Sequence, residues 1–259
     1  MTRSPVIGFA VLLSLGLAAW GGDHDPPPQE YGDIQTLPEP QRGLLPSMNI
    51  ADPVGWGDER PVVPEGYEIT AIATDLQIPR QTLVLPNGDI LVAEGKGGNA
   101  PKLKPKDVIA GPIKAAGTTK AKSGDRLTLL RDADGDGTYE MQGVFAEGLN
   151  APYGLALVDG NLYVANQDAL VSFDYRDGQT RASGPPTEVT KLPSEINHHW
   201  TKALAASEDG RYLYVGIGSN SNITERGMTA EVDRAVVWQV DAATGAHKTY
   251  ATGLRNPTA

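Results

Sequence analysis

Two adjacent histidines, His198 and His199, are the residues of this chain best suited to acid–base chemistry. The 259-residue sequence contains only four histidines, and these two precede a strand-like run, the turn Glu208-Asp209-Gly210 and a second strand, Tyr212 to Ile217. Imidazole has an unperturbed pKa close to neutrality, so a loop histidine held by flanking strands can accept a proton. Such a pair can also have a purely structural role, and the rest of the sequence has to separate the two.

The composition excludes several kinds of chemistry. The chain has no cysteine, which removes disulfides, thiol nucleophiles, zinc–cysteine sites and covalent attachment of c-type haem. A net charge of −10 argues against nucleic acid or an anionic membrane surface as partner. The 30 glycines and 20 prolines favour many turns, as an all-β fold requires.

Residues 1–20 are predicted to be a signal peptide. Arg3 gives a positive start, and the apolar run Val6 to Leu17 has the length of a signal-peptide core and is shorter than the roughly twenty residues that span a bilayer. Residues 17–21 resemble a lipoprotein processing site, but Trp20 stands where the lipid-bearing cysteine would be. We therefore expect an exported protein, periplasmic or secreted, without a lipid anchor.

The remaining chain divides at about residue 65. Residues 21–64 are rich in proline, glycine and acidic residues, for example Asp25-Pro26-Pro27-Pro28, and proline gives stiff, extended chain. We interpret this region as a linker or an arm that wraps the next domain. Residues 65–259 consist of short apolar runs separated by Asn-Gly or Asp-Gly turns, which is typical of β-hairpins.

One hairpin phrase occurs three times in this second region, at residues 86–94, 158–166 and 208–216. Its central glycines, at 88, 160 and 210, are 72 and 50 residues apart, and repeats of about fifty residues made of several strands are typical of β-propeller blades. A β-sandwich is the alternative, although it would not repeat one phrase at this interval. We predict an all-β propeller with about three to four blades.

Six phrases in this region carry a family resemblance. They lie at residues 85–94, 129–137, 148–154, 197–202, 215–222 and 253–257. In this order they resemble the glucose/sorbosone dehydrogenase family, in particular its sorbosone dehydrogenase-like branch. The resemblance implies an exported six-bladed propeller that uses pyrroloquinoline quinone (PQQ) and Ca²⁺ to oxidise a sugar or an aldehyde, and passes the electrons to an acceptor that the sequence does not identify.

The resemblance also implies a catalytic base. Aligning the turn Asp209-Gly210 with the equivalent turn of the family places His199 on the base that takes the substrate hydroxyl proton. His198 takes this place if the loop register differs by one, and is otherwise grouped with the cofactor-binding residues. For the neighbouring Trp200 we favour core packing over stacking on a flat cofactor.

Three further residues are implied as cofactor ligands. Arg255 and Asn256 match the family's Arg-Asn-Pro phrase, which reaches the quinone oxygens and carboxylates. The planar guanidinium suits carboxylates, and it can stabilise negative charge that grows on a quinone oxygen, so Arg255 also has an expected catalytic role. Asn150 lies in a loop that enters the central face in the family.

An acidic turn spans residues 132–140. Asp132, Asp134, Asp136 and Glu140 place oxygen donors at positions 1, 3, 5 and 9 of a calcium-loop pattern. An EF-hand would need glutamate at position 12, where Gly143 stands. The sequence therefore favours a polar hairpin, with a Ca²⁺ site formed by the three aspartates as the alternative.

Two other function classes remain open. A metal-dependent, lactonase-like hydrolase would need a ring of carboxylates and amides, which Glu94, Asn150, Asn166 and Asn220 could supply in part. A propeller that only binds ligands or partners is the other.

The lysine-rich insert at 95–122 is interpreted as a solvated loop, with docking of an acidic partner as the alternative. Because propellers close with about four to eight blades, we interpret the chain as the N-terminal portion of a longer protein and expect the 259-residue piece to be inactive and poorly stable.

Overall fold

The computed structural model describes residues 55, 57, 59–98 and 121–258. The chain divides into two compact units, Met1–Asn49 and Ile50–Ala259. The first unit, with the predicted signal peptide, lies outside the described residues, as do most of the linker 21–64 and of the lysine-rich insert. In the part of the chain that is described, no helix has the length and apolar character needed to cross a membrane.

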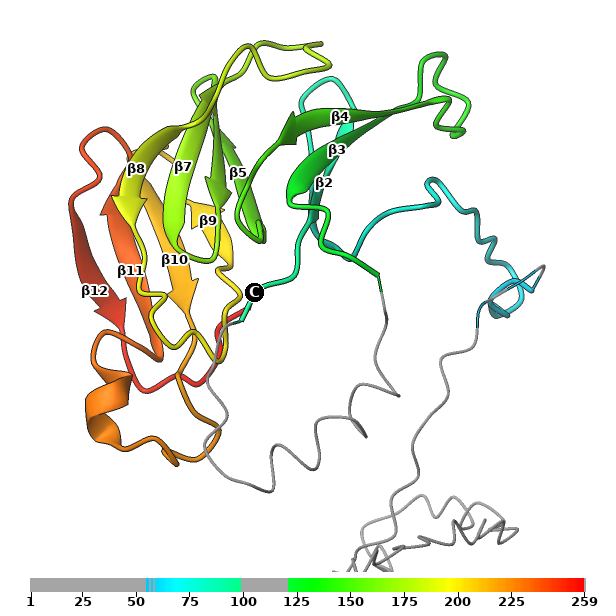
Figure 1. Ribbon diagram of the computed structural model, residues 1–259. Helices are drawn as coiled ribbons and strands as arrows, with labels where there is room; N and C mark the ends of the chain where they lie inside the picture. The colour runs from blue at the N-terminus through cyan, green and yellow to red at the C-terminus, as the bar shows by residue number, and fades with distance from the viewer. Residues whose placement is uncertain (1–54, 56, 58, 99–120, 259) are drawn as a thin grey trace, which may run out of the picture. The chain divides into compact units, whose positions relative to one another are not determined.

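The second unit contains three four-stranded antiparallel sheets, each built from consecutive strands (Figure 1). The first sheet has the strands β1 (Pro79–Val84), β2 (Ile90–Glu94), β3 (Arg126–Arg131) and β4 (Met141–Glu147). The second has β5 (Gly154–Val158), β6 (Asn161–Ala165), β7 (Ala169–Asp174) and β8 (Thr187–Lys191). The third has β9 (Leu204–Ala206), β10 (Tyr212–Ile217), β11 (Val236–Asp241) and β12 (His247–Ala251). A short 3₁₀ helix, η1 (Met228–Glu231), lies between β10 and β11.

The repeated hairpin phrase forms the first turn of each sheet, as predicted. Each turn places its glycine at positive φ, with values of 89° at Gly88, 76° at Gly160 and 69° at Gly210. In the tightest of the three, Val158 pairs directly with Asn161, and Asp159 also has positive φ. Two consecutive residues at positive φ form the hairpin turn whose twist matches that of the strands, and glycine adopts this geometry without steric cost.

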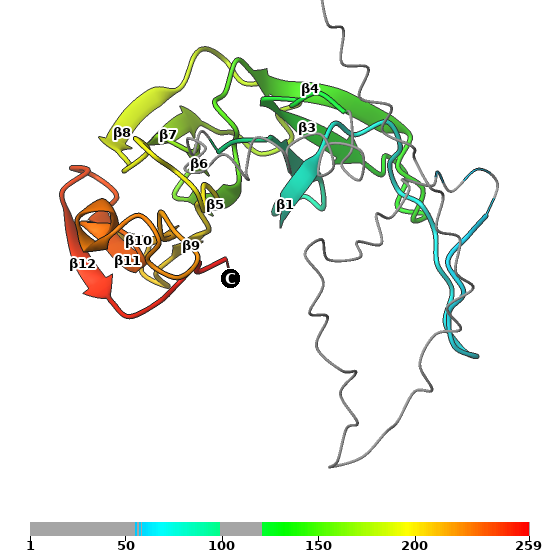
Figure 2. The same cartoon turned by 60° about the horizontal axis from the view of Figure 1, so that its bottom comes forward.

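The second sheet is buried on both faces (Figure 2). Leu162 and Val164 of β6 belong to a core that includes Leu127 and Phe145 of the first sheet. A second core joins the second sheet to the third, and its members include Tyr163, Ala165, Leu170, Leu213, Val215 and Trp238. Neighbouring residues of a strand point to opposite faces, so β6 contributes alternately to both cores. Four-stranded meanders stacked face to face in this way are blades of a propeller, and the predicted fold class is confirmed.

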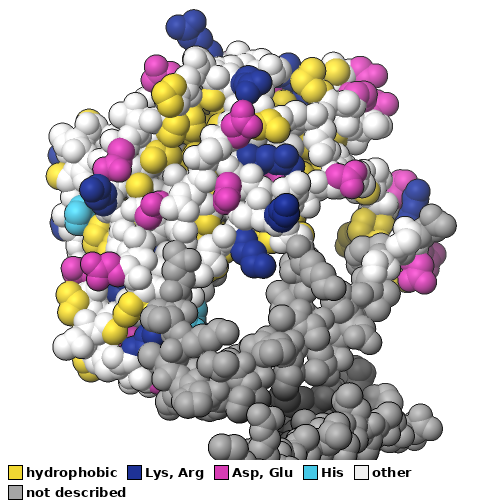
Figure 3. All heavy atoms as spheres, viewed as in Figure 1, with side chains coloured by type: hydrophobic (Ala, Val, Ile, Leu, Met, Phe, Trp, Pro, Cys, Tyr) yellow, Lys and Arg dark blue, Asp and Glu magenta, His cyan; other side chains and the backbone are white. Residues whose placement is uncertain are grey.

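Charged side chains of both signs are interspersed on the face of the molecule drawn in Figure 3. Nucleic-acid-binding proteins instead gather lysine and arginine into a stripe or patch. Over the described residues visible from this side, the two signs of charge are not separated into such a stripe or patch.

Candidate active site at the end of the third sheet

Three segments meet at the end of β10, and Ser219 joins them. The backbone N–H of His199, in the loop between β8 and β9, donates to the backbone oxygen of Ser219 at 3.1 Å. The backbone N–H of Ser219 donates to the backbone oxygen of Arg255, after β12, at 2.7 Å. His199 and Arg255, 56 residues apart in sequence, are therefore held on either side of one residue.

The His199 imidazole is fixed through Nδ1. This atom lies 2.9 Å from the backbone oxygen of Ser219 and 2.9 Å from its Oγ. A carbonyl oxygen can only accept, and the Ser219 hydroxyl donates to the backbone oxygen of Ser221 at 2.6 Å, so both oxygens act as acceptors toward Nδ1. We assign the proton of neutral His199 to Nδ1, which leaves Nε2 with a free lone pair.

The surroundings of His199 favour its neutral form. Burial is the main cause that lowers the pKa of this imidazole below its usual 6.5, and the positive charges of Arg255, His198 and Arg234 lower it further. The hydrogen bond with the Ser219 carbonyl acts in the opposite direction but does not reverse the shift. A histidine with this pKa is unprotonated at neutral pH and can accept a proton at Nε2.

His198 is placed differently from its neighbour. The two imidazoles meet edge to face, with ring centroids 4.8 Å apart and an interplanar angle of 82°. Across the described residues, no hydrogen bond fixes the His198 ring. The loop therefore orients His199 through its own ring nitrogen, whereas it positions His198 by ring contact.

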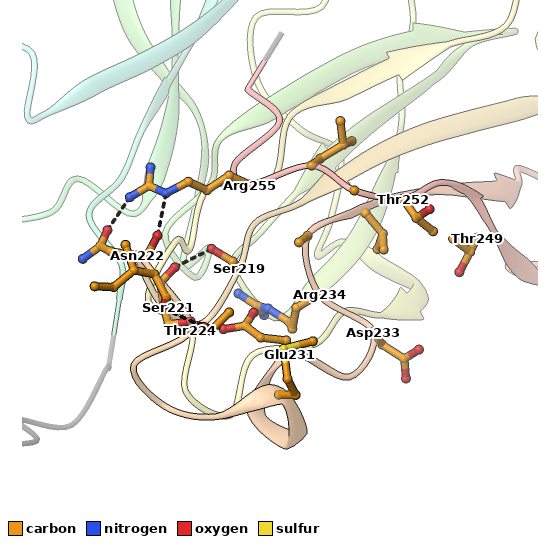
Figure 4. A pocket seen from close by; sticks show the side chains of 16 residues that line it. Ser219, Ser221, Asn222, Thr224, Glu231, Asp233, Arg234, Thr249, Thr252 and Arg255 are labelled. Carbon is orange, nitrogen blue, oxygen red and sulfur yellow. Dashed lines mark hydrogen bonds between the residues drawn. The ribbon is translucent and has the colours of Figure 1, made fainter.

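Arg255 is exposed and oriented by the neighbouring loop (Figure 4). Its Nε donates to the backbone oxygen of Asn222 at 3.2 Å, and its Nη2 donates to the Asn222 side-chain oxygen. Asn222 is in turn held by Glu225, whose carboxylate accepts the backbone N–H groups of Asn222 and Ile223, each at 2.8 Å. These backbone hydrogen bonds lower the pKa of Glu225 to about 2. The guanidinium lines an open cavity of about 570 Å³ together with Ser219, and Nη1 has no hydrogen-bond partner within the described chain.

Asn256 and His199 approach each other across Gly218. A methyl group at Gly218 would lie 2.5 Å from the Asn256 Oδ1 and 2.5 Å from the His199 Cβ. Asn256 Oδ1 also accepts a hydrogen bond from Thr201 Oγ1 at 3.3 Å. The close approach therefore requires glycine at the end of β10, and it brings the amide and the imidazole to one place.

Trp200 is half-buried by contacts from other blades. The guanidinium of Arg80 lies 5.0 Å from its ring centre, and Tyr153 meets it edge-on at 6.1 Å. A methyl group at Gly97 would come within 2.8 Å of the indole. These contacts correspond to the packing role that the sequence favours.

Asn150 is connected to the histidine loop through one side chain. Its Nδ2 donates to Asp168 at 2.7 Å and its Oδ1 accepts from Gln167 Nε2 at 2.7 Å. Gln167 Oε1 then accepts from Asn197 Nδ2 at 3.3 Å. Asn150 is exposed, and its contacts link it to the base loop without placing it against His199.

Three buried residues that were not assigned from the sequence stabilise the loop between β8 and β9, which carries His199. Asn197 is fully buried at φ 52°, and its Oδ1 accepts from Lys202 Nζ at 2.9 Å and from Arg234 Nη2 at 3.3 Å. Asn197 and Lys202 lie within the matched phrase 197–202, which was a signal for their place but not for their contacts. Arg234 lies outside every matched phrase, and no sequence signal identified it.

The acidic turn lies between β3 and β4, in the first sheet. Asp132, Asp134, Asp136 and Glu140 each place one carboxylate oxygen within 4.8 Å of the others. Carboxylate oxygens of this turn also accept its backbone N–H groups, for example those of Gly135 and Gly137 on Asp132 at 2.7 and 2.8 Å. The turn thus forms both arrangements considered from sequence, a polar hairpin and a group of carboxylates that can hold a cation.

The residues considered for a hydrolase have different surroundings. Glu94 is fully buried and forms an ion pair with Arg126 at 2.9 Å, and it also accepts from the Thr128 hydroxyl. Asn166 and Asn220 are buried, each with a side-chain oxygen that has no partner. In this part of the chain, only the acidic turn brings three or more histidine or carboxylate side chains within metal-binding distance.

Residues 61–256 match a protein family described as a domain of unknown function, DUF7133. The chain belongs to this family. A comparison with curated proteins finds no match. Several solved structures do resemble this chain.

Three of these solved structures are sugar-oxidising or carbohydrate-active proteins by their titles. The holo form of the pyranose dehydrogenase PQQ domain from Coprinopsis cinerea has 17% identity and a TM-score of 0.56, and the match covers 75% of this chain and 43% of that one. The iodide structure of a family AA12 carbohydrate-active enzyme from Trichoderma reesei has 20% identity and a TM-score of 0.53, covering 76% and 45%. The calcium structure of the same enzyme family from T. reesei has 19% identity and a TM-score of 0.50, covering 75% and 42%.

This DUF7133 chain thus spans less than half the length of the solved chains that it resembles. Identities of this size establish a common fold. The resemblance drawn from the sequence is confirmed at that level: the chain has the propeller fold of the pyranose dehydrogenase PQQ domain and of the AA12 protein.

Proposed function

We propose that this chain is part of an exported dehydrogenase that uses PQQ to oxidise a sugar or an aldehyde, with His199 as the base. One observation carries the proposal: His199 Nδ1 lies 2.9 Å from the Ser219 carbonyl, which leaves Nε2 available, at the point where Arg255 and Asn256 also arrive. A free imidazole nitrogen can take the proton of a hydroxyl group, and a cation and an amide can stabilise negative charge on a carboxylated quinone.

The donor groups of this site fit PQQ. Arg255 keeps Nη1 unpaired among the described residues, and the Asn256 amide lies within reach of the same glycine as His199. An arginine fork recognises carboxylates, and PQQ carries three of them. When bound, PQQ supplies a quinone that accepts a hydride. In our proposal Arg255 and Asn256 hold this group, His198 lies beside it, and Asn150 contributes through the Gln167 side chain.

His199 would take the substrate hydroxyl proton at Nε2. Its lowered pKa keeps the imidazole neutral at pH 7, and the Ser219 carbonyl holds the ring in one orientation. Removal of the proton as the substrate carbon is oxidised avoids both a free alkoxide and a strongly cationic intermediate. The permanently charged Arg255 would stabilise negative charge that develops opposite the base.

The titles of the similar structures support a carbohydrate as substrate. The electron acceptor is outside the proposal. We also propose Ca²⁺ as a cofactor, for which the calcium structure of the AA12 protein and the four carboxylates of the acidic turn offer support. Export follows from the predicted signal peptide at residues 1–20.

Dye-linked oxidation of aldoses tests the proposal. The full gene product that carries this chain is assayed with PQQ and Ca²⁺, alongside the His199→Ala variant and a His247→Ala control, whose histidine lies in β12. We expect dye reduction in the wild type and the control, and a loss of at least a hundredfold for His199→Ala, since a positioned base contributes about 10²–10⁴-fold. Full activity of His199→Ala would refute the role of this residue.

The same wild-type and variant proteins also test the two alternative functions, a lactone hydrolase and a binding module. Hydrolysis of lactones without PQQ would favour the hydrolase, although Glu94 is already engaged by Arg126. A protein that neither binds PQQ nor turns over any of these substrates would be a binding module.

A further inference from the structure

Two buried cations meet on one neutral oxygen beneath His199. Lys202 Nζ and Arg234 Nη2 lie 2.9 and 3.3 Å from Asn197 Oδ1. Lys202 and Asn197 have no exposed surface, and Arg234 is 4% exposed. Burying charge is costly unless an opposite charge compensates it, so this arrangement calls for a functional reason.

No carboxylate forms an ion pair with either cation within the described chain. Glu231 is close enough to act on Arg234, but its oxygens accept from the backbone N–H of Asn220 at 2.8 Å and from the Ser221 hydroxyl. Asp168 acts on Lys202 and is hydrogen-bonded to Asn150. Burial lowers the pKa of Lys202 to about 7 and that of Arg234 to about 10. Neither cation is therefore directly paired, and burial outweighs the opposing effects of Glu231 and Asp168.

Arg234 also connects three parts of the site. It donates from Nε to the backbone oxygen of Gly218 at 2.7 Å, from Nη1 to that of Pro193 at 2.5 Å, and from Nη2 to that of His199 at 3.2 Å. Pro193 lies near the start of the histidine loop, and Gly218 directly precedes the residue that binds the His199 ring. Figure 4 shows the Arg234 guanidinium in this region, close to Ser219 and Glu231.

We propose that Arg234 is the positioning residue of this site. It clamps the histidine loop to the end of β10 so that His199 Nδ1 faces the Ser219 carbonyl, and it supplies a positive charge that favours the neutral base. The hydrogen bonds of Arg234 can be tested whether or not the protein is a dehydrogenase. Their importance for catalysis rests on the proposed function, in which His199 is the base.

A test has to separate two effects of Arg234 on His199: its hydrogen bonds, which fix the geometry of the loop, and its charge, which acts on the pKa of the imidazole. Arg255, His198 and Arg234 act on its pKa directly. Lys202 and Glu231 lie one step away, and Glu225 acts on His198. A change of geometry alters the tautomer, whereas a change of charge alters the pKa, and one variant is available for each.

Arg234→Lys keeps a positive charge but loses the planar fork that reaches four acceptors. Asn197→Asp keeps the acceptor at Oδ1 and leaves the Arg234 clamp in place, while it introduces a carboxylate in contact with both cations. Aspartate, like asparagine, tolerates the positive φ of this position. The matched control is Asn161→Asp, at the half-buried first residue of β6 in the second sheet.

The readout is NMR of the His199 ring in the protein without cofactor, which gives the tautomer from the ¹⁵N shifts and the pKa from a titration. We expect the Nδ1–H tautomer with a pKa below 6.5 in the wild type and in Asn161→Asp. Arg234→Lys is expected to show a mixture of tautomers, and Asn197→Asp the wild-type tautomer with a pKa higher by roughly half a unit.

A wild-type tautomer in Arg234→Lys, accompanied only by a lower melting temperature, would overturn the clamp. If Arg234→Lys does not fold, Asn197→Asp decides the electrostatic part, and an unchanged pKa in that variant overturns it. Absence of dehydrogenase activity in the wild type would reject the proposed function without affecting either NMR result, so the two failures are distinguishable.

Discussion

His199 Nδ1 lies 2.9 Å from the backbone oxygen of Ser219, and this contact determines which ring nitrogen can do chemistry. Many histidine bases are oriented by a carboxylate, whose negative charge raises the pKa of the imidazole. Here a neutral carbonyl has that place, and the charges around the ring are positive. The result is a well-oriented base that stays neutral to lower pH than an isolated histidine.

The first prediction concerns pH. Activity requires neutral His199, so kcat/KM should rise with pH and level off above an inflection below 6.5, because burial and nearby cations lower this pKa. The same shift has a consequence for stability: the unfolded chain binds the proton more tightly, so stability is lost as pH falls below about 6.5. Steady-state rates from pH 4 to 8 test the first point. An inflection at or above 6.5 that disappears in His199→Ala would contradict the lowered pKa.

The second prediction concerns Arg255. Arg255→Gln removes a positive charge that acts on His199, so the pKa of His199 should rise, and binding of PQQ should weaken by at least tenfold, as expected for the loss of a charge-assisted hydrogen bond. NMR titration and equilibrium binding measure the two effects. Arg211→Gln is the control, since Arg211 is exposed in the hairpin at the other end of β10. A loss of affinity that is equal in both variants would point to net charge rather than to this site.

The sequence predicted the inner strands of each sheet because their signals are local. Glycine turns and apolar residues mark β2, β6 and β10, which are buried along most of their length. The fourth strands were not predicted. β12 (His247–Ala251) is exposed along nearly its whole length, so its residues do not show the apolar pattern from which strands are recognised.

The site was predictable only in part, for a similar reason. His199 and Arg255 stand in recognisable phrases, and both lie beside Ser219. The clamp beneath them joins Arg234 to acceptors 16 to 41 residues away, and such contacts depend on how blades fold rather than on spacing in the chain. Buried arginine is rare, so Arg234 would be assigned to the surface from its type alone.

The third prediction concerns Gly218. A methyl group there would lie 2.5 Å from both the Asn256 Oδ1 and the His199 Cβ, so Gly218→Ala should destabilise the protein by about 1–3 kcal/mol and displace the base. Thermal or urea unfolding gives the first effect and the NMR tautomer of His199 the second. Gly143→Ala is the control, because no atom lies within 4 Å of its added methyl group. Equal stability of the two variants would show that the end of β10 adapts freely.

The fourth prediction concerns the acidic turn. If Asp132, Asp134, Asp136 and Glu140 hold Ca²⁺, millimolar calcium should raise the melting temperature by mass action, and a chelator should reverse the rise. Asp134→Asn removes a charge from the group and should abolish the effect, whereas Asp174→Asn, in the exposed end of β7, should not. A calcium response that survives in Asp134→Asn would locate the ion elsewhere.

The fifth prediction concerns Lys202 and alkaline pH. Its pKa is about 7 in the folded chain against 10.5 for a free lysine, so between these values the unfolded state binds more protons than the folded state. Stability should therefore rise with pH across this window, by at most about 1.4 kcal/mol per pH unit from this residue. Lys202→Met removes the contribution, and urea unfolding at pH 7 to 10 should show a flatter dependence, whatever the variant's absolute stability. Lys191→Met, in the exposed end of β8, should keep the wild-type slope. If the slopes of the wild type and Lys202→Met coincide, Lys202 is protonated at neutral pH in both states, and the positive charge beneath His199 is fully compensated.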